Sequence, residues 1–247
     1  MGKQASTILE MLLDGKEKES LVKENITFYQ QTRNKLTYHS GVLEGIRLKE
    51  KQVELIGENA AVDLYGSEPV TIDDIDETKN HMKCFQYILD HVGEVITKEF
   101  IRTLHSMIKA NTHSGARENI GSYKTKENPI GNMATTAPEQ VETELSKLLE
   151  DYNQKEEIYI EDIFHFHSDF ILISPFLDAN GRIARMLMFK ECLKYNITPF
   201  IIEDVHKSIY FRIIRDSREY VDLAMDLCLQ EQKKYKVLVD LYKKKKW

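Results

Sequence analysis

Apolar residues recur at helical spacing along most of the chain, with charged residues between them. Residues 4–35 carry apolar side chains such as Ile8, Leu12 and Phe28 among many charges, which predicts one or two amphipathic helices. The same spacing predicts further helices at about residues 37–48, 76–89, 100–108, 138–149, 160–173, 181–195 and 206–241. A mostly helical fold follows from this pattern.

Two stretches interrupt the helical pattern. Residues 60–76 are acidic and contain helix breakers, which predicts a linker. Residues 111–137 are punctuated by glycine and proline; residues 120–125 predict a short strand, and a β-hairpin is expected near Tyr123–Thr135. Because the chain has only 11 Gly and 5 Pro, an all-β fold with many turns is disfavoured.

The composition fits a soluble globular protein, since 42% of the 247 residues are hydrophobic and 30% are charged. The formal net charge of −6 disfavours a general nucleic-acid binder, which would carry a strongly basic face. No apolar run approaches the ~18–20 residues that span a bilayer, and the first residues lack the apolar core of a signal peptide. The three cysteines lack metal-ligand spacing and are expected to be buried thiols. We therefore expect a cytoplasmic protein with no membrane or nucleic-acid partner.

The segment Ile173–Arg185 combines turn residues with charges. Pro175 is expected to end the preceding helix, because the residue before a proline disfavours helical backbone angles. Residues 178–181 (Asp-Ala-Asn-Gly) predict a turn, and a new helix is expected to begin at Gly181 or Arg182. A small-residue loop that leads into a helix leaves backbone N–H groups unpaired at the positive end of the helix dipole. The sequence therefore predicts an anion site.

The charges around this turn indicate which anion it binds. Arg182 and Arg185 lie three residues apart in the first turn of the predicted helix, where acidic side chains are normally favoured. An anion such as a polyphosphate in front of the helix explains cations at that position. Asp178 adds a hard oxygen ligand for the Mg²⁺ that accompanies nucleotide phosphates. A structural loop with a capping Asn180 and two surface arginines is the alternative.

Residues 174–185, Ser-Pro-Phe-Leu-Asp-Ala-Asn-Gly-Arg-Ile-Ala-Arg, resemble the signature of the Fic family, H-P-F-x-[DE]-[GA]-N-G-R-x-x-R. Eight of its nine specified positions match, and only the first, Ser174, differs. Flanking segments are similar to the helix before the motif, to the β-hairpin flap and to an early core helix of that family: residues 164–170, 121–124 with 129–132, and 77–80. The resemblance covers about residues 72–215.

This resemblance implies an all-α Fic fold, a helical bundle with one short β-hairpin flap, and transfer of AMP from Mg·ATP to a hydroxyl of a target protein. It implies that Asp178 binds Mg²⁺ and that Arg185 meets the γ-phosphate of ATP. It also assigns the α- and β-phosphates to Asn180, Gly181 and Arg182. The resemblance further implies that Ile130, Gly131 and Asn132 align the target segment by strand addition. It also implies that Tyr210 lies beside the adenine.

A second resemblance lies upstream. Residues 40–45, Ser-Gly-Val-Leu-Glu-Gly, are similar to the family's inhibitory motif, [ST]-x-x-x-E-[GN], which lies on a helix before the core. On a helix, Ser40 and Glu44 lie one turn apart on the same side, and Gly45 follows. The resemblance implies that Glu44 meets Arg185 and excludes the γ-phosphate. It places the chain among members with an N-terminal inhibitory helix (class II), and a homodimer is one expectation for such a helix.

The expected organisation has three parts. Residues 1–70 form an N-terminal helical region, with the inhibitory helix at about 37–48. Residues 71–215 form the Fic core with flap and signature motif. Residues 216–247 form a C-terminal helix and a basic tail.

Ser174 stands where the family has a histidine, the general base that takes the proton from the attacking hydroxyl. A neutral serine accepts no proton near pH 7, and general acid–base help is worth roughly 10²–10⁴ in rate. Three hypotheses follow: a slow enzyme that uses water or Ser174 as a relay, an engineered inactivation, or a nucleotide-binding relative that no longer transfers AMP. His167 lies about 10 Å back along the preceding helix, so direct replacement is not expected. His165 and His167 are expected to be core or interface side chains.

The favoured interpretation is a protein adenylyltransferase that modifies a target protein or itself, slowed by Ser174 and restrained by Glu44. The main alternative is a regulatory binding protein that binds nucleotide without transferring AMP. A third hypothesis is half of an inhibitory complex that binds a partner protein through residues 4–50.

Overall fold

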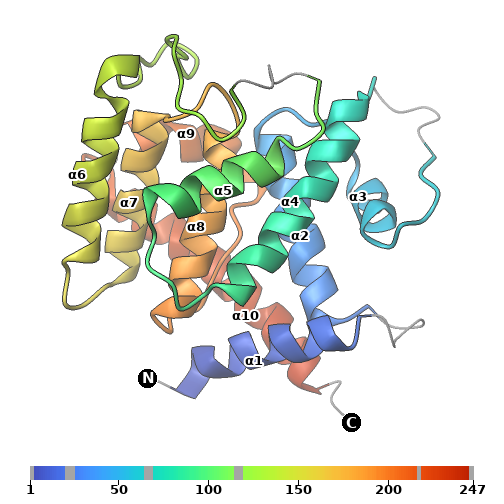
Figure 1. Ribbon diagram of the computed structural model, residues 1–247. Coiled ribbons are helices and arrows are strands. Elements are labelled where there is room, and N and C mark those ends of the chain that lie inside the picture. Colours follow the sequence, from blue (N-terminus) through green and yellow to red (C-terminus); the bar gives the residue numbers. More distant parts are fainter. Residues whose placement is uncertain (1–2, 20–25, 64–68, 114–118, 216–217, 245–247) are drawn as a thin grey trace.

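Ten α-helices make up most of the chain that the computed structural model describes, which is residues 3–19, 26–63, 69–113, 119–215 and 218–244 (Figure 1). In chain order they are α1 (Lys3–Glu17), α2 (Phe28–Leu43), α3 (Glu50–Gly57), α4 (Ile72–Asp90), α5 (Lys98–Ile108), α6 (Val141–Asn153), α7 (Ile160–Ile173), α8 (Asn180–Lys194), α9 (Lys207–Arg215) and α10 (Val221–Lys244). Short 3₁₀ turns precede α6 (Pro138–Gln140) and α9 (Asp204–His206). The predicted all-α fold is confirmed.

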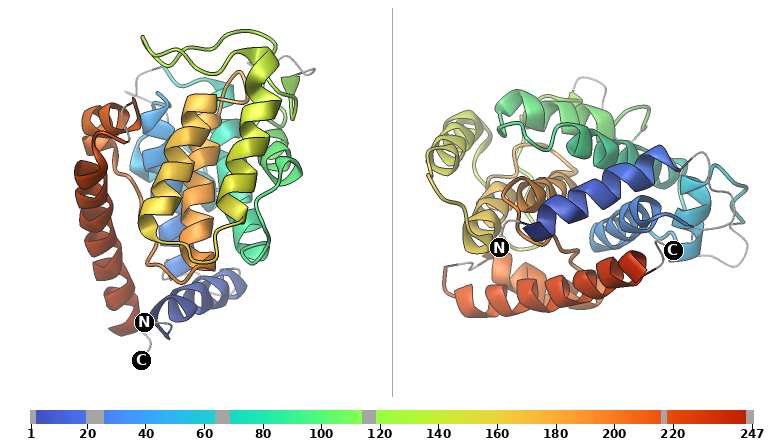
Figure 2. Two further views of the ribbon diagram at one scale, coloured as in Figure 1. Left: turned by 90° about the vertical axis from the view of Figure 1, so that its left-hand side faces the viewer. Right: turned by 90° about the horizontal axis from the view of Figure 1, so that it is seen from below.

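Helix α8 is the central helix and carries the second half of the motif. Thirteen of its 15 residues are buried, so it is covered on all sides. It packs against α1, α2, α4, α5 and α7. Helices α6, α7 and α8 stand side by side, as the left view of Figure 2 shows. Because α2 and α4 both contact α8, side chains from the first third of the chain reach the two buried arginines of the motif.

Helix α2 differs from the predicted inhibitory helix. The pattern predicts a separate helix over residues 37–48, whereas these residues begin inside α2, and Ser40 lies in its last turn. Glu44 is the capping residue at the C-terminus of α2. Gly45 then adopts φ +95°, a left-handed angle that glycine tolerates and that ends the helix before Leu48.

Helix α4 begins about one turn earlier than the predicted start at Asp76. Thr71 and Asp74 form a capping box: the Asp74 amide donates to Thr71 Oγ1 at 3.0 Å, and the Thr71 amide donates to Asp74 Oδ2 at 2.8 Å. Glu77 therefore lies in the second turn, where it is buried. Of the predicted linker, residues 64–68 lie outside the described residues.

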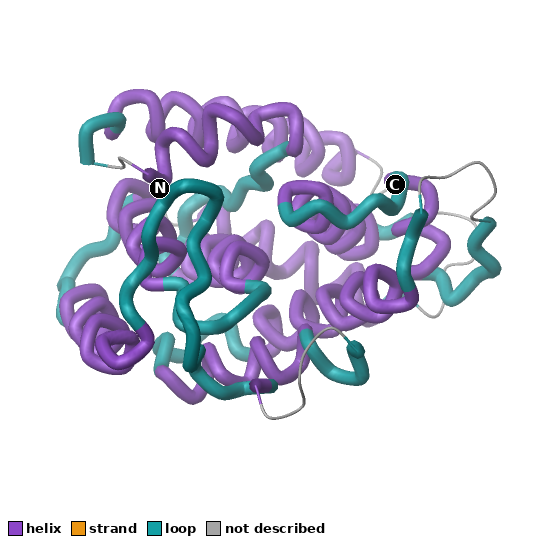
Figure 3. The backbone as a smooth tube through the Cα atoms, turned by 90° about the horizontal axis from the view of Figure 1, so that it is seen from above, coloured by secondary structure: helices purple, strands orange, loops and turns teal. Residues whose placement is uncertain are grey.

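The predicted β-hairpin near Tyr123–Thr135 is wrong in its extent. The described residues of the connection from α5 to α6 contain no strand, and Figure 3 draws this connection as a long loop. Its only ladder pairing among the described residues is an isolated antiparallel bridge, in which Ile130 and Met133 exchange two backbone hydrogen bonds of 3.0 Å. Gly131, at φ +58°, turns the chain between them.

The predicted helix over residues 206–241 is two helices, α9 and α10, that pack on each other. Arg212 of α9 donates to the Tyr220 hydroxyl at 3.1 Å and lies 4.7 Å from the centre of its ring, which ties the start of α10 to α9. Of the predicted basic tail, residues 243 and 244 end α10, and residues 245–247 lie outside the described residues.

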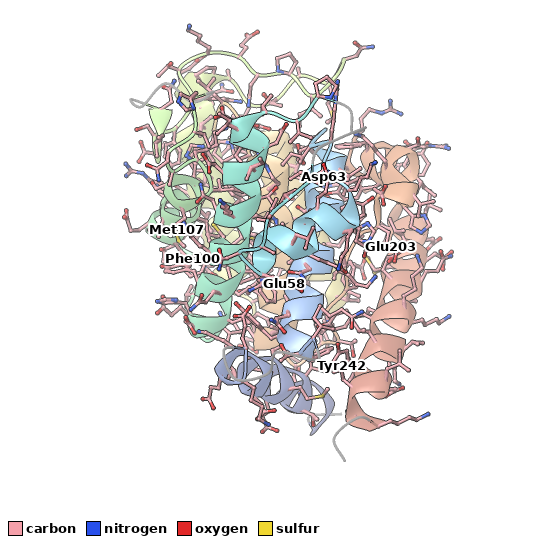
Figure 4. All side chains as sticks on the ribbon, turned by 90° about the vertical axis from the view of Figure 1, so that its right-hand side faces the viewer. Glu58, Asp63, Phe100, Met107, Glu203 and Tyr242 are labelled. Carbon is pink, nitrogen blue, oxygen red and sulfur yellow. The ribbon has the colours of Figure 1, made fainter. Side chains whose placement is uncertain are left out.

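Helix α10 runs along one side of the molecule and is attached to segments far from it in the chain (Figures 2 and 4). Lys234 pairs with Glu203 at 2.7 Å, and the Tyr242 hydroxyl donates to the Ile26 carbonyl at 2.9 Å. Figure 4 labels Glu203 and Tyr242 beside α10. Residues at the two ends of the described chain are thereby held together.

The three cysteines, Cys84, Cys192 and Cys228, are free and buried, as predicted. Burial raises the pKa of the Cys84 thiol to about 12. Among the described helices, none has both the length and the apolar character needed to cross a bilayer.

Candidate functional site

Two residues with left-handed backbone angles shape the loop between α7 and α8. Ser174 ends α7 with φ +46°, and Ala179 precedes α8 with φ +64°. The Asn180 side chain closes the loop: its Oδ1 accepts the Phe176 amide at 2.9 Å, and its Nδ2 donates to the Phe176 carbonyl at 2.7 Å. The sequence predicts a turn over residues 178–181, whereas Asn180 and Gly181 are already the first two residues of α8.

The first turn of α8 favours an anion. Its N-cap residue, Ala179, makes no side-chain capping hydrogen bond, and the first N–H groups of a helix have no partner within that helix. Gly181 lies in this turn, and a Cβ there would overlap the Glu44 carboxylate. Glycine at this position therefore admits a carboxylate to the positive end of α8.

Arg185 is 2% exposed and is surrounded by hydrogen-bond partners. Its Nε donates to Ser40 Oγ at 2.9 Å, and one terminal nitrogen donates to the Ser40 carbonyl at 3.0 Å and to Glu44 Oε1 at 2.6 Å. The other terminal nitrogen donates to the Tyr210 hydroxyl at 3.2 Å. The structure thus brings together Ser40, Glu44 and Arg185, as the resemblance implies, with Gly45 just beyond them.

Asp178 stands at the rim of the site with its side chain 54% exposed. Its Oδ2 accepts Lys109 Nζ at 2.7 Å and an Arg182 terminal nitrogen at 3.4 Å. Partial burial favours the neutral acid, but the charges of Arg182 and Lys109 outweigh it and lower the pKa of Asp178 to about 2. Asp178 is therefore ionised at neutral pH.

Arg182 does not point freely into solvent. Its guanidinium is buried and pairs with the carboxylate of Glu77, which also pairs with Lys109. Its Nε is buried and has no hydrogen-bond partner among the described residues, which is costly for a donor.

A cleft of about 230 Å³ lies in front of the first turn of α8. The residues that line it come from the loop before α8, from the α5–α6 connection and from α2 and α9; they include Glu44, Ile130, Ser174, Asp178, Asn180, Gly181 and Phe211. Ser174 is 1% exposed, and its hydroxyl donates to the Ile171 carbonyl at 2.8 Å. No histidine is among the described residues that line this cleft.

A second cleft of about 520 Å³ adjoins the first. The predicted flap residues Ile130, Gly131 and Asn132 line it, opposite α9. Ile130 and Phe211 line both clefts, so the two spaces are neighbours.

Tyr210 is fully buried behind the cleft, and it is Phe211 that reaches the cleft wall. The Tyr210 hydroxyl lies 2.8 Å from His167 Nε2. Burial lowers the pKa of His167 to about 3, so its imidazole is neutral. His167 is thus a core residue, as predicted, whereas His165 is a partly exposed side chain 3.9 Å from Glu161.

Sequence reasoning gave no role to Lys124, which fixes the α5–α6 connection to the motif loop. Its buried Nζ donates to Asn128 Oδ1 at 2.6 Å, Thr135 Oγ1 at 2.8 Å and the Ile173 carbonyl at 3.2 Å. Its amide donates to the Pro175 carbonyl at 2.8 Å. The Lys124 amide is thus used by the loop before α8 and is not available to a hairpin ladder.

Glu77 and Lys109 were missed as well. Glu77 belongs to a segment similar to a core helix of the Fic family, and Lys109 follows the predicted helix 100–108. A charged residue at the end of an apolar helical pattern is normally expected to be exposed to solvent. The packing of α4 and α5 around α8 is therefore needed to show that Lys109 pairs with Glu77.

Comparison with known proteins places these features in context. Residues 95–192 match the model of the Fic/DOC family. The protein adenylyltransferases fic-1 of Caenorhabditis elegans and Caenorhabditis briggsae are each 23% identical over 194 residues, which is 74% of this chain and 37% of each relative. The chain thus spans little more than a third of the length of these curated relatives.

Solved structures share the architecture. A crystal structure of a Fic domain containing signaling protein from Bacteroides thetaiotaomicron matches with a TM-score of 0.69 and 23% identity, over 86% of this chain and 79% of that one. A fragment of Fic-1 from C. elegans matches with a TM-score of 0.72 and 18% identity, over 98% and 73%. At these identities the likeness establishes the fold. The architecture is that of the Fic fold, and residues 95–192 within it match the Fic/DOC family model.

Proposed function

We propose that the chain is a protein adenylyltransferase, which transfers AMP from Mg·ATP to a hydroxyl group of a target protein or of itself. The observation that carries this proposal is the start of α8. There, Asn180 and Gly181 of the first turn and the carboxylates of Asp178 and Glu44 line one cleft. The buried Arg182 and Arg185 pair with these two carboxylates. Positive groups held in place around a cleft are what phosphoryl transfer requires.

Asp178 suits a role as a ligand of Mg²⁺. It is ionised, half exposed and at the cleft rim. Among the described residues no group of three His, Cys, Asp or Glu side chains could hold a metal ion, so nucleotide phosphates would supply the other ligands. When bound, Mg²⁺ would neutralise phosphate charge.

The transfer step makes one bond and breaks one. The target hydroxyl oxygen forms a bond to the α-phosphorus, the bond from that phosphorus to the β-phosphate bridging oxygen breaks, and pyrophosphate leaves. The N–H groups at the start of α8 and Arg185 hold the phosphates. The hydroxyl proton passes to water, because the Ser174 hydroxyl is already bonded to the Ile171 carbonyl.

Glu44 restrains this activity. Its carboxylate occupies the positive end of α8 and pairs with Arg185, the group that would meet the γ-phosphate. ATP can bind productively only when Glu44 leaves, because two anions repel each other at one site. The names of the fic-1 relatives, both protein adenylyltransferases, favour the same function.

A second candidate function is nucleotide binding without transfer, in a regulatory binding protein. The observation that favours it is the cleft lining, in which the described residues include no histidine and Ser174 is almost fully buried.

Intact-mass spectrometry after incubation with Mg·ATP separates the two functions. The Glu44→Gly protein is assayed with and without candidate target proteins, and the Glu44→Gly protein that also carries Asp178→Ala is the control. A mass gain of one AMP that disappears with Asp178→Ala supports the transferase. ATP binding by calorimetry without any mass gain, including after Ser174→His, supports the binding protein instead.

A further inference from the structure

Lys109 is a buried cation that lies directly against the proposed metal ligand. It caps the C-terminus of α5, where the helix dipole favours a cation, and its side chain is 3% exposed. Asn80 of α4 fixes this end of α5, because its Nδ2 donates to the Ile108 carbonyl at 3.2 Å and to the Ala110 carbonyl at 2.7 Å. The backbone around Lys109 is therefore held in one place.

The hydrogen bonds of Asp178 use most of its acceptor capacity. A carboxylate has about four lone-pair sites, two on each oxygen. Oδ2 accepts both Lys109 Nζ, at 2.7 Å, and Arg182, at 3.4 Å, while Oδ1 accepts the Ala179 amide at 2.6 Å. One site on Oδ1 is left by this count, so a metal ion could contact Asp178 through a single oxygen only.

Among the described residues, the charges of this set of ion pairs balance. Glu77 and Asp178 carry two negative charges, and Lys109 and Arg182 carry two positive charges, all within one connected set of ion pairs. A hard divalent cation needs an excess of negative oxygen ligands to leave water. A neutral cluster with one vacant acceptor site does not provide that excess, whereas the phosphates of a nucleotide do.

We propose that Lys109 is the resident counter-ion of Asp178 and keeps free divalent cations out of the empty site, so that the metal ion enters only with nucleotide phosphates. This rests on the metal role of Asp178 in the proposed function. Lys109 acts here as a positioning residue: it holds the carboxylate at the cleft rim and sets the charge that an incoming metal ion meets.

The test is a titration of nucleotide-free protein with Mn²⁺, which reports binding through the loss of the electron paramagnetic resonance signal of the aqueous ion. The variant is Lys109→Met. Lys98→Met is the matched control, because it makes the same change at the other end of α5, where Lys98 pairs with the exposed Glu142. We expect Lys109→Met to bind Mn²⁺ at least about tenfold more tightly than wild type or Lys98→Met, since one positive charge beside the ion is removed.

Two further variants keep the result interpretable. Lys109→Gln removes the charge but keeps a donor for Glu77, and it should show the same gain if Lys109→Met folds poorly. Adding Asp178→Ala to either variant should abolish the gain. Equal Mn²⁺ affinity in wild type and Lys109→Gln, or a gain that survives Asp178→Ala, would overturn the proposal. Because the titration contains no nucleotide, its outcome is independent of whether the chain transfers AMP.

Discussion

At the scale of single residues, the pairing of Glu44 with Arg185 governs the site. Arg185 is buried and is held by the Ser40 side chain and backbone as well as by Glu44. A buried guanidinium needs a counter-charge, so removing Glu44 leaves Arg185 with an uncompensated charge that a phosphate can neutralise. Glu44 is about one quarter exposed, which allows it to leave the site without unfolding α2.

Glu44→Gly is therefore expected to raise the affinity for Mg·ATP at least about tenfold, because the carboxylate no longer competes for Arg185. Isothermal titration calorimetry measures this. Glu58→Gly is the matched control, since Glu58 also caps the C-terminus of a helix, α3, but is exposed and is not among the described residues that line the cleft (Figure 4). Equal ATP affinity in wild type and Glu44→Gly would show that Glu44 does not control the site.

Ser174→His in the Glu44→Gly background is expected to raise the rate of AMP transfer, by up to roughly 10²–10⁴, since it adds a general base at the cleft. The left-handed backbone of Ser174 accepts histidine, one of the residue types enriched in that region. Label incorporation from α-³²P-ATP gives the rate, with Ser174→Ala as the control. A rate that is the same for histidine, serine and alanine would exclude this position from proton transfer.

The ionisation of Asp178 makes a prediction about pH. Its pKa is lowered from about 3.9 in an unfolded chain to about 2, so its ion pairs stabilise the folded protein above pH 4 and lose that effect as the pH falls through 2. The difference in unfolding free energy between wild type and Asp178→Asn should therefore be constant from about pH 7 to pH 5 and shrink below about pH 4. Urea titrations measure it. A difference that changes already between pH 7 and pH 5 would contradict the assigned ionisation.

At the scale of elements, the sequence predicts the bounds of a helix best where local sequence signals and tertiary packing favour the same structure. The bounds of α7 are predicted correctly and those of α8 within one residue, because Pro175 and the small-residue loop mark a break between two strongly apolar helices. The predicted hairpin is largely absent because backbone amides of the connection donate outside it, that of Lys124 to the Pro175 carbonyl and that of Thr136 to the Leu172 carbonyl. Whether these residues form a hairpin or bond to the loop before α8 depends on tertiary contacts, which the pattern of apolar residues in the sequence does not indicate.

Asn180→Ala tests the loop as an element. It removes both side-chain hydrogen bonds to the buried Phe176 backbone, so it should destabilise the fold by about 1–3 kcal/mol. It should also weaken nucleotide binding in the Glu44→Gly background, because the start of α8 is no longer fixed. Chemical unfolding and calorimetry measure the two effects. Full nucleotide affinity in a destabilised Asn180→Ala protein would show that the loop clamp does not shape the site.

At the scale of the whole molecule, the site is assembled from both halves of the chain. The motif predicts Asp178, Arg182 and Arg185 from one short segment, and the structure brings all three to the start of α8. Their partners Glu44, Glu77 and Lys109 lie about 70 to 140 residues away. Glu44 was found through its own short motif, whereas Glu77 and Lys109 have no signal beyond an ordinary helical pattern. The predicted homodimer and target protein stay predictions.

A crystal structure of the Glu44→Gly protein with Mg·ATP would test the proposed nucleotide site most directly. We predict a triphosphate at the start of α8, with Arg185 within hydrogen-bond distance of its γ-phosphate and Asp178 at the metal ion. A nucleotide bound elsewhere, or an Arg185 that remains on Ser40 with no phosphate in the cleft, would contradict it.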